Sequence, residues 1–285
     1  MYKVLDANLL SIPGTVQELA PLAKKYGFEG LCVRQNLLEN PAEAMEAAKV
    51  MRDLDMKWGL LPTPVDFFAE DVEGKVFDDA LETLSRWADV AEKMGVKYSY
   101  NHIWPTSATR AFEENFEWHV RRLEKIQKVF RDHGIRYGFE FLGPYELRIA
   151  NVHPFVHTIA GVLSIADAAG GYTGFLFDTY HWYTGSRRMD DVYYAAQNSH
   201  RMINMHLNDG FAGLEPDMQR DLRRQMPMTS GVINSRELYR IIKNSGYDGP
   251  VMLEPMAPTT KRFAQQDPEV SIAECRDAFL RVEQA

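Results

Sequence analysis

The sequence predicts an α/β protein of one domain, a closed (β/α)₈ barrel (TIM barrel) over residues 1–285. Two observations indicate it. Amphipathic helical segments alternate with short apolar runs along the whole chain, and strands that alternate with helices form a parallel sheet covered by helices. Glycine follows several of the helical segments, because it adopts left-handed backbone at little steric cost: Gly27, Gly95, Gly134 and Gly246.

Eight strand–helix units are expected in order, the number that a barrel of this length requires. Strands are expected at residues 2–8, 29–34, 57–62, 97–103, 135–141, 174–178, 202–207 and 250–254. Helices are expected at residues 15–26, 42–54, 77–94, 112–133, 153–169, 189–199, 235–245 and 270–283. A doubly wound open sheet is the alternative, but no GxGxxG motif follows the first strand. We find no linker or low-complexity stretch.

Composition narrows the classes of partner. The net charge of −8 and the pI near 5.5 disfavour a binder of nucleic acid or of anionic membranes. We see neither an N-terminal signal sequence nor an apolar run of about 20 residues that would span a membrane. Cys32 and Cys275 are far apart and outside any CxxC motif, so we expect two free buried thiols in a cytoplasmic protein.

Four consecutive expected strands end in residues that bind metals. Glu140, Asp178, His206 and Glu254 occupy these ends, and a barrel of this kind carries its chemistry at the carboxyl ends of the strands. Three carboxylates and one imidazole suit one divalent ion, with Mn²⁺ expected and Mg²⁺, Co²⁺ or Zn²⁺ as alternatives. The competing interpretation is that each residue is a salt-bridged group at the barrel rim.

These residues and their motifs resemble those of the xylose-isomerase-like TIM barrels. The resemblance rests on Glu140, DTYH at 178–181, HLND at 206–209 and LEP at 253–255. It covers nearly the whole chain in strand order and is most specific from residue 135 onward. This superfamily includes sugar isomerases, ketose 3-epimerases, inosose isomerases and dehydratases, and apurinic endonucleases. The ketose 3-epimerases and inosose isomerases have the most similar pattern.

The resemblance implies several residues that bind substrate. EFLGPYELRIAN reproduces a substrate-contacting Glu and a following Asn as Glu146 and Asn151, and DTYH supplies His181. In the family an Arg follows strand seven in an R-x-x-P turn, and RQMP offers Arg224. The loop at residues 208–231 is longer than the family pattern, however, so Arg223 or Arg220 are alternatives, and Asp209 is expected to support the metal ligands or cap this loop.

Aromatic and histidine side chains near the strand ends are further candidates. Trp104 and His102 end the fourth strand and are expected to face the substrate. Phe67, Phe68, Trp182 and Tyr183 are equally compatible with sugar contacts and with core packing. The other histidines fall on expected helices or loops and are interpreted as solvated: His119, His133, His153, His157 and His200.

The chemistry implied by the resemblance is proton transfer next to a carbonyl, through an enediolate. A divalent ion would polarise the carbonyl, and Glu140 and Glu254 would remove and return the proton. The main hypothesis is a metal-dependent isomerase or epimerase of a non-phosphorylated sugar or keto-cyclitol, and a homo-oligomer is compatible with it. A dehydratase or lyase on a keto-sugar, such as an inosose or a 3-keto-glycoside, is the alternative. An apurinic endonuclease and a non-enzymatic binding barrel are disfavoured by the acidic charge and by the complete ligand set.

Overall fold

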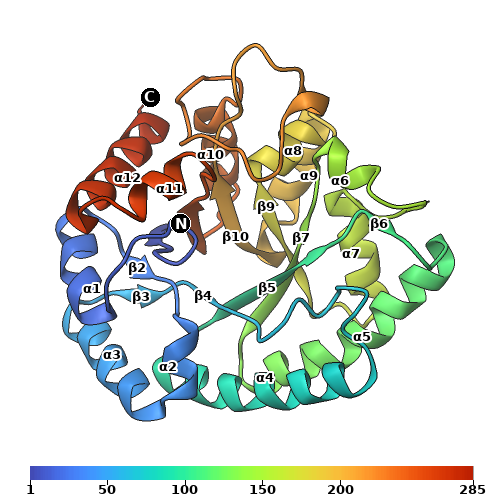
Figure 1. The fold of residues 1–285 in the computed structure, drawn as a ribbon, viewed down its shortest axis with the longest axis horizontal. Coiled ribbons are helices and arrows are strands. Elements are labelled where there is room, and N and C mark those ends of the chain that lie inside the picture. Colours follow the sequence, from blue (N-terminus) through green and yellow to red (C-terminus); the bar gives the residue numbers. More distant parts are fainter. Residues whose placement is uncertain (285) are drawn as a thin grey trace.

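The strands form one parallel sheet that runs around the centre of the molecule (Figure 1). The computed structural model describes residues 1–284. Its main sheet has the order β3-β2-β1-β11-β10-β9-β7-β5-β4, and each neighbouring pair is parallel. The strands are β1 (Tyr2–Leu5), β2 (Gly30–Leu31), β3 (Lys57–Trp58), β4 (Leu60–Leu61), β5 (Tyr98–Ile103), β7 (Arg136–Phe141), β9 (Gly174–Asp178), β10 (Met202–Leu207) and β11 (Pro250–Leu253).

Gly59 separates β3 from β4 at the point where the sheet closes. β3 pairs with β2, and β4 pairs with β5, so the segment that we expected as one strand joins both ends of the sheet. The amide of Gly59 donates to the carbonyl of Leu31 at 2.7 Å, which continues the pairing across the break. A Cβ at this position would lie 2.5 Å from Val4 Cγ1, so only glycine fits inside the barrel here. The fold is therefore the α/β TIM barrel that the sequence predicts.

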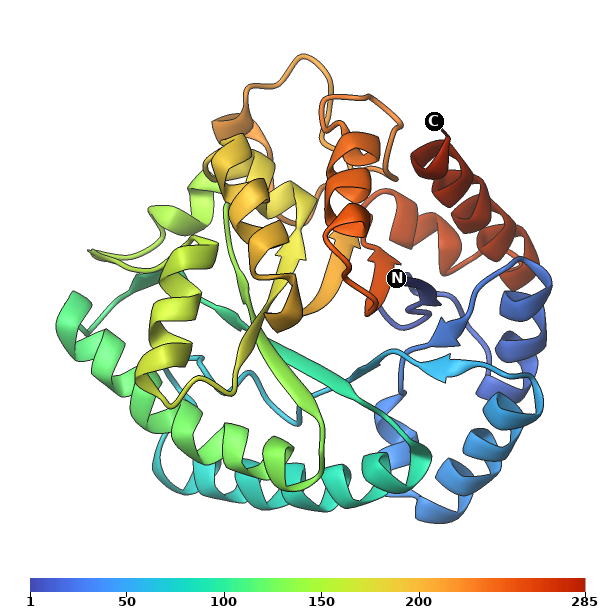
Figure 2. The same ribbon diagram turned by 180° about the vertical axis from the view of Figure 1, so that it is seen from behind.

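Helices cover the outside of the barrel, as the view from behind also shows (Figure 2). The structure confirms the eight expected helices, with shifts at their ends. They are α1 (Val16–Lys25), α3 (Pro41–Asp53), α4 (Gly74–Met94), α5 (Phe112–Asp132), α7 (Ile159–Ala168), α9 (Met189–Gln197), α10 (Ser235–Asn244) and α12 (Pro268–Glu283). The glycines expected after helices adopt positive φ, with Gly95 at 87° as the C-cap of α4. Among the described helices, none has the length and apolar character needed to cross a membrane.

One expected helix begins later than the sequence pattern indicates. We expected it over residues 153–169, but α7 begins at Ile159, and residues 153–154 form β8 (His153–Pro154). β8 pairs in antiparallel fashion with β6 (Thr106–Ser107). Pro154 disfavours a helical conformation at the residue before it, and the side chain of Thr158 caps the true start of α7 by accepting from Gly161 N.

Several short elements lie in the loops between the strands and the longer helices. They are α2 (Gln35–Glu39), α6 (Tyr145–Arg148), α8 (Thr179–Thr184), α11 (Thr259–Phe263) and the 3₁₀ turns η1 (Ser199–Arg201) and η2 (Pro216–Met218). None is long enough to display a helical period in sequence, which is why the pattern did not predict them.

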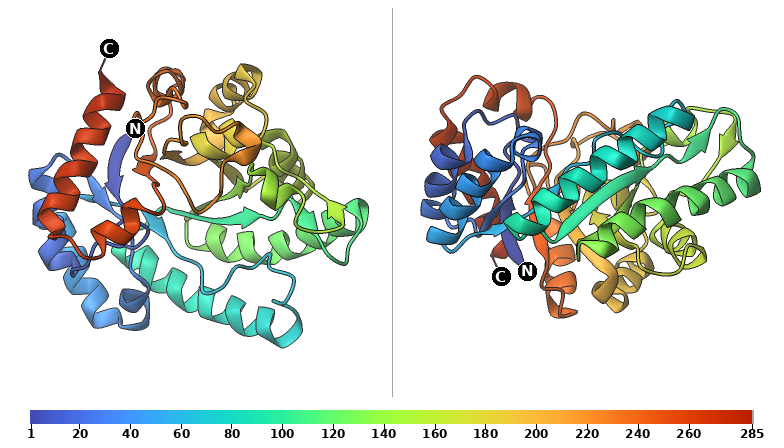
Figure 3. Two further views of the ribbon diagram at one scale, coloured as in Figure 1. Left: turned by 45° about the horizontal axis from the view of Figure 1, so that its top comes forward. Right: turned by 90° about the horizontal axis from the view of Figure 1, so that it is seen from below.

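The core has two layers, one inside the barrel and one between the strands and the helices. The inner cluster of buried residues comprises Tyr2, Val4, Cys32, Leu60, Leu176, Ile203 and Met252. The larger outer cluster includes Cys275 of α12, and both cysteines are buried and free, as expected. The first strand and the last helix come together, since Lys3 Nζ lies 3.3 Å from Glu283 Oε2, and both labelled ends lie near each other (Figure 3).

His119 is buried, so the expectation that it is solvated was wrong. Its exposed fraction is 2%, because it lies on the covered face of α5 beside Asn115 and Trp118. The ring stacks on Phe68, with centroids 5.1 Å apart, and on Phe155, at 4.7 Å. Nδ1 lies 2.7 Å from the Asn115 carbonyl and donates to it. Burial lowers the pKa of His119 to about 3.

This buried imidazole makes the protein less stable in mild acid. The unfolded chain takes up a proton near pH 6.5 and the folded chain only near pH 3, so the unfolded state binds more protons between these values. The stability that His119 contributes is complete above pH 6.5 and declines as the pH falls. We expect His119→Phe to reduce the loss of stability between about pH 7.5 and pH 5.0 by about 2 kcal/mol, measured by urea unfolding at both values. His200→Gln, at an exposed position, is the control; an unchanged pH dependence in His119→Phe would contradict the prediction.

Candidate metal centre and active site

Four buried ligand residues converge at the carboxyl ends of neighbouring strands. Glu140 lies in β7, Asp178 ends β9, His206 lies in β10, and Glu254 follows β11 directly. His206 and Asp178 are paired in register across the two strands that carry them. One ligand atom from each of the four residues lies within 4.8 Å of the others. The four residues that the sequence singles out therefore form one cluster.

The imidazole of His206 lies between the carboxylates. Its Nδ1 is 3.1 Å from Glu140 Oε1, 3.2 Å from Glu254 Oε1 and 3.8 Å from Asp178 Oδ2. Burial by itself would lower the pKa of His206, but Glu254 and Glu140 raise it well above the ordinary value. The negative charge around His206 Nδ1 attracts a proton, and it would attract a divalent cation for the same reason. A metal ion and a proton therefore compete for such a histidine.

One fully buried carboxylate oxygen of the cluster has no aligned hydrogen-bond donor among the described residues. This is Glu140 Oε2, which is fully buried. His102 Nε2 lies 3.0 Å away, but it is not aligned for a hydrogen bond. A buried, unpaired carboxylate oxygen is costly, and coordination to a divalent cation would satisfy it. The donor set of three carboxylates and one imidazole thus fits such an ion.

The charges of the carboxylates depend on the cations beside them. Burial opposes ionisation of Glu140, but His206 and His102 hold the pKa of that carboxyl well below its usual range. Glu254 likewise has a lowered pKa, because His206 and Arg224 outweigh its burial. At Asp178 burial dominates over the nearby cations and raises the pKa to about 7. Asp178 is therefore the carboxylate whose charge depends most on an added cation.

Arg224 is buried against the cluster, as the R-x-x-P resemblance implied. Its Nη1 donates to Asp178 Oδ2 at 2.9 Å and to Glu254 Oε2. Its Nη2 donates to Asp221 Oδ1 at 2.7 Å, so Asp221 holds the far side of the guanidinium. The Arg224 carbonyl also accepts from the amide of Met256, just beyond β11. The two alternative arginines make other contacts: Arg220 pairs with Glu146, and Arg223 stacks on Phe211.

The long loop at residues 208–231 is closed at its base. The backbones of Asp209 and Gln225 exchange two hydrogen bonds, at 2.9 and 2.7 Å. The Asp209 carboxylate accepts from the amides of Ser230, Gly231 and Ile233, at 2.7 to 3.1 Å. Of the two roles expected for Asp209, support of the metal ligands or capping of the loop, the structure shows the capping of the loop. Because this closure ends one residue after Arg224, it brings that side chain to the cluster.

His181 is oriented by two contacts at the start of α8. Asp178 is the N-cap of that helix, and its Oδ1 accepts from His181 N at 3.1 Å. Nδ1 of His181 accepts from Gly143 N at 3.2 Å, so the neutral ring carries its hydrogen on Nε2. Nε2 lies 3.2 Å from Arg224 Nη2 and 3.9 Å from Asp178 Oδ2. Burial lowers the pKa of His181, and its N–H therefore faces the cluster in the neutral form.

A sequence model of the family described as xylose isomerase-like TIM barrel matches residues 20–279. The chain belongs to this family. No curated protein sequence matches it at a significant level.

Solved structures of the family share the fold at low sequence identity. The IOLI protein, solved with a bound zinc atom, is 16% identical with a TM-score of 0.79, over 99% of this chain and 98% of that one. D-psicose 3-epimerase from Clostridium cellulolyticum H10, solved with D-tagatose, is 13% identical with a TM-score of 0.71, over 99% and 98%. The 3-keto-D-glucoside 4-epimerase of E. coli is 14% identical with a TM-score of 0.74, over 100% of both chains.

The remaining residues that the family pattern implies lie farther from the ligands. Glu146 Oε1 accepts from Asp221 N at 2.7 Å, so it touches the residue that holds Arg224. Asn151 donates to Thr106 Oγ1 at 3.1 Å. Asn151 and Trp104 line a separate cavity of about 170 Å³, which none of the four ligands lines. That Glu146, Asn151 and Trp104 contact substrate stays a prediction.

Three of the aromatic candidates, Phe67, Phe68 and Trp182, belong to the core. Phe67 and Phe68 are 0% and 2% exposed, which favours core packing over a substrate contact. Trp182 is also buried and donates through Nε1 to the carbonyl of Arg188.

Asn208 also contacts the cluster, and the sequence pattern did not indicate it, although it lies within the HLND motif. Its Nδ2 lies 3.2 Å from both oxygens of Asp178, and its Oδ1 accepts from Thr179 Oγ1 at 3.0 Å. Its position in the sequence could have indicated this role, because Asn208 lies between His206 and Asp209, and polar residues next to a metal ligand often orient other ligands.

Proposed function

We propose that this protein is a divalent-metal-dependent isomerase or epimerase of a non-phosphorylated sugar or keto-cyclitol. The observation that carries the proposal is the convergence of Glu140, Asp178, His206 and Glu254 within 4.8 Å, all buried. Two of the similar structures are sugar epimerases by name, and another holds zinc. We propose Mn²⁺ as the resident ion, held by these four residues.

Glu140 and Glu254 have the positions and charges of an acid–base pair. Both lie close to His206 Nδ1, which is 3.1 Å from Glu140 Oε1 and 3.2 Å from Glu254 Oε1. Both have lowered pKa values, burial being outweighed by nearby cations, so both are ionised at neutral pH and able to accept a proton. The bound ion would polarise the substrate carbonyl and so acidify the adjacent C–H.

The other polar groups would bind and orient the substrate. We propose that the Nε2–H of His181 donates to the substrate oxygen that gains negative charge, because the contact from Gly143 fixes this tautomer. Arg224 would supply a second donor beside it, and Asp221 keeps that guanidinium in place. Glu140 removes the C–H proton from one face, and Glu254, after it takes up a proton from water, delivers that proton to the other face and inverts the carbon. Glu140 then releases its proton to water, so each turnover exchanges one proton with the solvent.

Two measurements test the proposal. Elemental analysis of the purified protein should find about one divalent ion per chain, the occupancy that one cluster of four ligands provides. Incubation of the Mn²⁺-loaded protein with ketohexoses, inososes and 3-keto-glucosides in D₂O should yield an isomeric product that carries solvent deuterium. An unsaturated or cleaved product would instead establish the dehydratase or lyase alternative. A protein that binds no divalent ion would contradict the proposal.

A further inference from the structure

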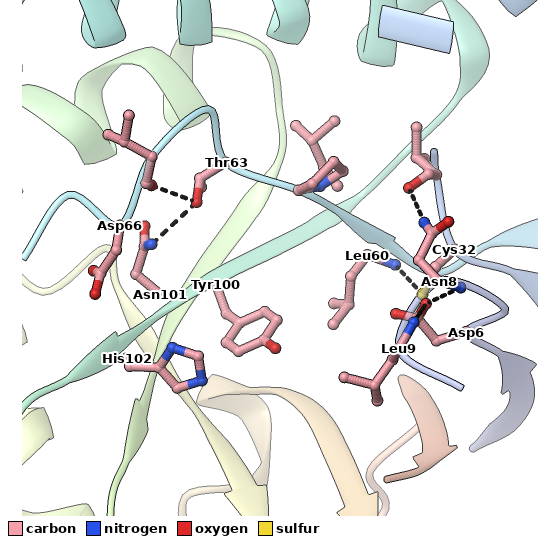
Figure 4. Close-up of a pocket in the computed structure, with 14 residues that line it drawn as sticks. Asp6, Asn8, Leu9, Cys32, Leu60, Thr63, Asp66, Tyr100, Asn101 and His102 are labelled. Carbon is pink, nitrogen blue, oxygen red and sulfur yellow. Dashed lines mark hydrogen bonds between the residues drawn. The ribbon is translucent and has the colours of Figure 1, made fainter. Parts of the chain in front are cut away.

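A cavity of about 430 Å³ opens beside the metal-ligand cluster. It lies at the carboxyl ends of β1, β2, β4 and β5 (Figure 4), and Arg224 is not among its lining residues. His102 connects the two sites, since it lines the cavity and its Nε2 lies 3.0 Å from Glu140 Oε2. We call this space the β1–β5 cavity. A molecule bound to the cluster therefore has room to extend into it.

The walls of the β1–β5 cavity combine apolar surface with groups that bind hydroxyls. Tyr100 and His102 project from β5 on one side, and Asp6, Asn8 and Leu9 lie on the other (Figure 4). The ring of Tyr100 is edge-on to His102 at 5.5 Å and to the ligand His206 at 5.9 Å. Thr63 and Asn101 add further polar groups. Apolar residues form much of the remaining lining: Val33, Leu60, Leu61, Pro62 and Val65. This mixture is typical of sites for small polar molecules with hydrocarbon faces.

The charge of the lining is negative. Asp6 and Asp66 are its charged residues, and neither Lys nor Arg lines the cavity among the described residues. Both oxygens of Asp66 accept hydrogen bonds, from Phe68 N and from Trp104 Nε1. Asp6 differs, because its Oδ1 accepts from the amides of Asn8 and Leu9 while Oδ2 has no donor among the described residues. Arg34 lies near Asp6 and donates to the carbonyl of Ile12.

We propose that the β1–β5 cavity binds an uncharged polyhydroxyl part of the substrate and that Asp6 rejects anionic analogues. This deepens the proposed function, on which it rests. Hydroxyl groups can donate to Asp6 Oδ2, and their C–H faces can lie against Leu60 and Tyr100. A phosphate or carboxylate would instead be repelled by both aspartates, and neither Lys nor Arg lines the cavity to offset this repulsion among the described residues. The volume is in the lower part of the range of about 300–1,000 Å³ for small-molecule sites, which suits one sugar or cyclitol ring.

The test compares two probes that differ in charge, D-fructose and D-fructose 6-phosphate, bound to the Mn²⁺-loaded protein and measured by calorimetry. We expect the wild-type protein to bind the neutral probe about tenfold more tightly or better, and Asp6→Asn to reduce this preference about tenfold. Asparagine keeps an Oδ1 acceptor for Asn8 and Leu9, so the turn is preserved. Asp66→Asn should shift the preference in the same direction.

Asp248→Asn is the matched control, because it makes the same change of net charge at the opposite end of β1, in the cavity lined by Tyr2 and Tyr98. The Asp248→Asn variant should prefer D-fructose over D-fructose 6-phosphate to the same extent as the wild-type protein. An unchanged preference in Asp6→Asn, or a wild-type protein that prefers the phosphorylated probe, would overturn the proposal. Binding needs no turnover, so this result is independent of the deuterium-exchange test. If the protein exchanges deuterium but Asp6→Asn leaves the preference for the neutral probe unchanged, only the role of the cavity is refuted. If the preference changes as expected but no deuterium is exchanged, only the proposed reaction is refuted.

Discussion

Glu140→Gln and Glu254→Gln are each expected to lower the rate of deuterium exchange into the substrate by about 10²–10⁴, the contribution typical of a positioned acid or base. Glutamine has nearly the same shape as glutamate and keeps one oxygen for His206, but it cannot accept the proton. The loss should appear in kcat, because the proton moves in the chemical step and not on binding. The measurement is single-turnover exchange followed by NMR.

The same two residues are also proposed metal ligands, so the two effects have to be separated. Each variant is assayed at saturating Mn²⁺, with the bound metal measured on the same sample. Glu124→Gln, at an exposed position of α5, is the control for loss of one negative charge. Full exchange activity in a metal-saturated Glu254→Gln or Glu140→Gln variant would remove that residue from the acid–base pair.

Arg224→Met should destabilise the metal-free protein by about 3–5 kcal/mol, the cost of leaving buried charges without their partner. Arg224 donates to both Asp178 and Glu254, and its exposed fraction is 2%. A divalent cation held by the same carboxylates would supply the missing positive charge. The destabilisation should therefore be much smaller when Mn²⁺ is saturating, and Mn²⁺ should raise the melting temperature of the variant more than that of the wild-type protein.

A thermodynamic cycle relates the smaller destabilisation in the presence of Mn²⁺ to the affinity of the variant for Mn²⁺. If the substitution costs less in the metal-bound protein than in the metal-free protein, the variant must bind Mn²⁺ more tightly by the same free energy. Arg223→Met is the matched control, since Arg223 stacks on Phe211, at 5.2 Å, and does not contact the ligands. Equal stabilisation of Arg224→Met and wild-type protein by Mn²⁺ would show that Arg224 does not compensate the ligand charges.

The helices and the strand ends were predictable because their signals are local. The apolar stripe before Gly134 and the positive φ of that glycine follow from a few neighbouring residues. The ligands were predictable for a related reason: parallel strands of a barrel end on one face, so polar residues at the ends of consecutive strands must come together. Glu140, Asp178, His206 and Glu254 needed no further information to be grouped.

What the sequence pattern did not determine depends on contacts between distant segments. The R-x-x-P motif favours Arg224, but the length of the loop left Arg220 and Arg223 as alternatives, and the closure between Asp209 and Gln225 is what places Arg224 at the cluster. His119 shares its helix with solvated residues, but Phe68 and Phe155 cover it from other loops.

The β1–β5 cavity likewise joins Asp6 to Tyr100 and His102, which are separated by most of the first half of the barrel. The sequence by itself therefore determined the fold and the four residues of the candidate metal site, since both rest on periodicity and strand order. The tertiary structure decided which cation compensates these four residues and which side chains line the cavity beside them, because packing between segments far apart in the chain sets the distances and burial of those groups.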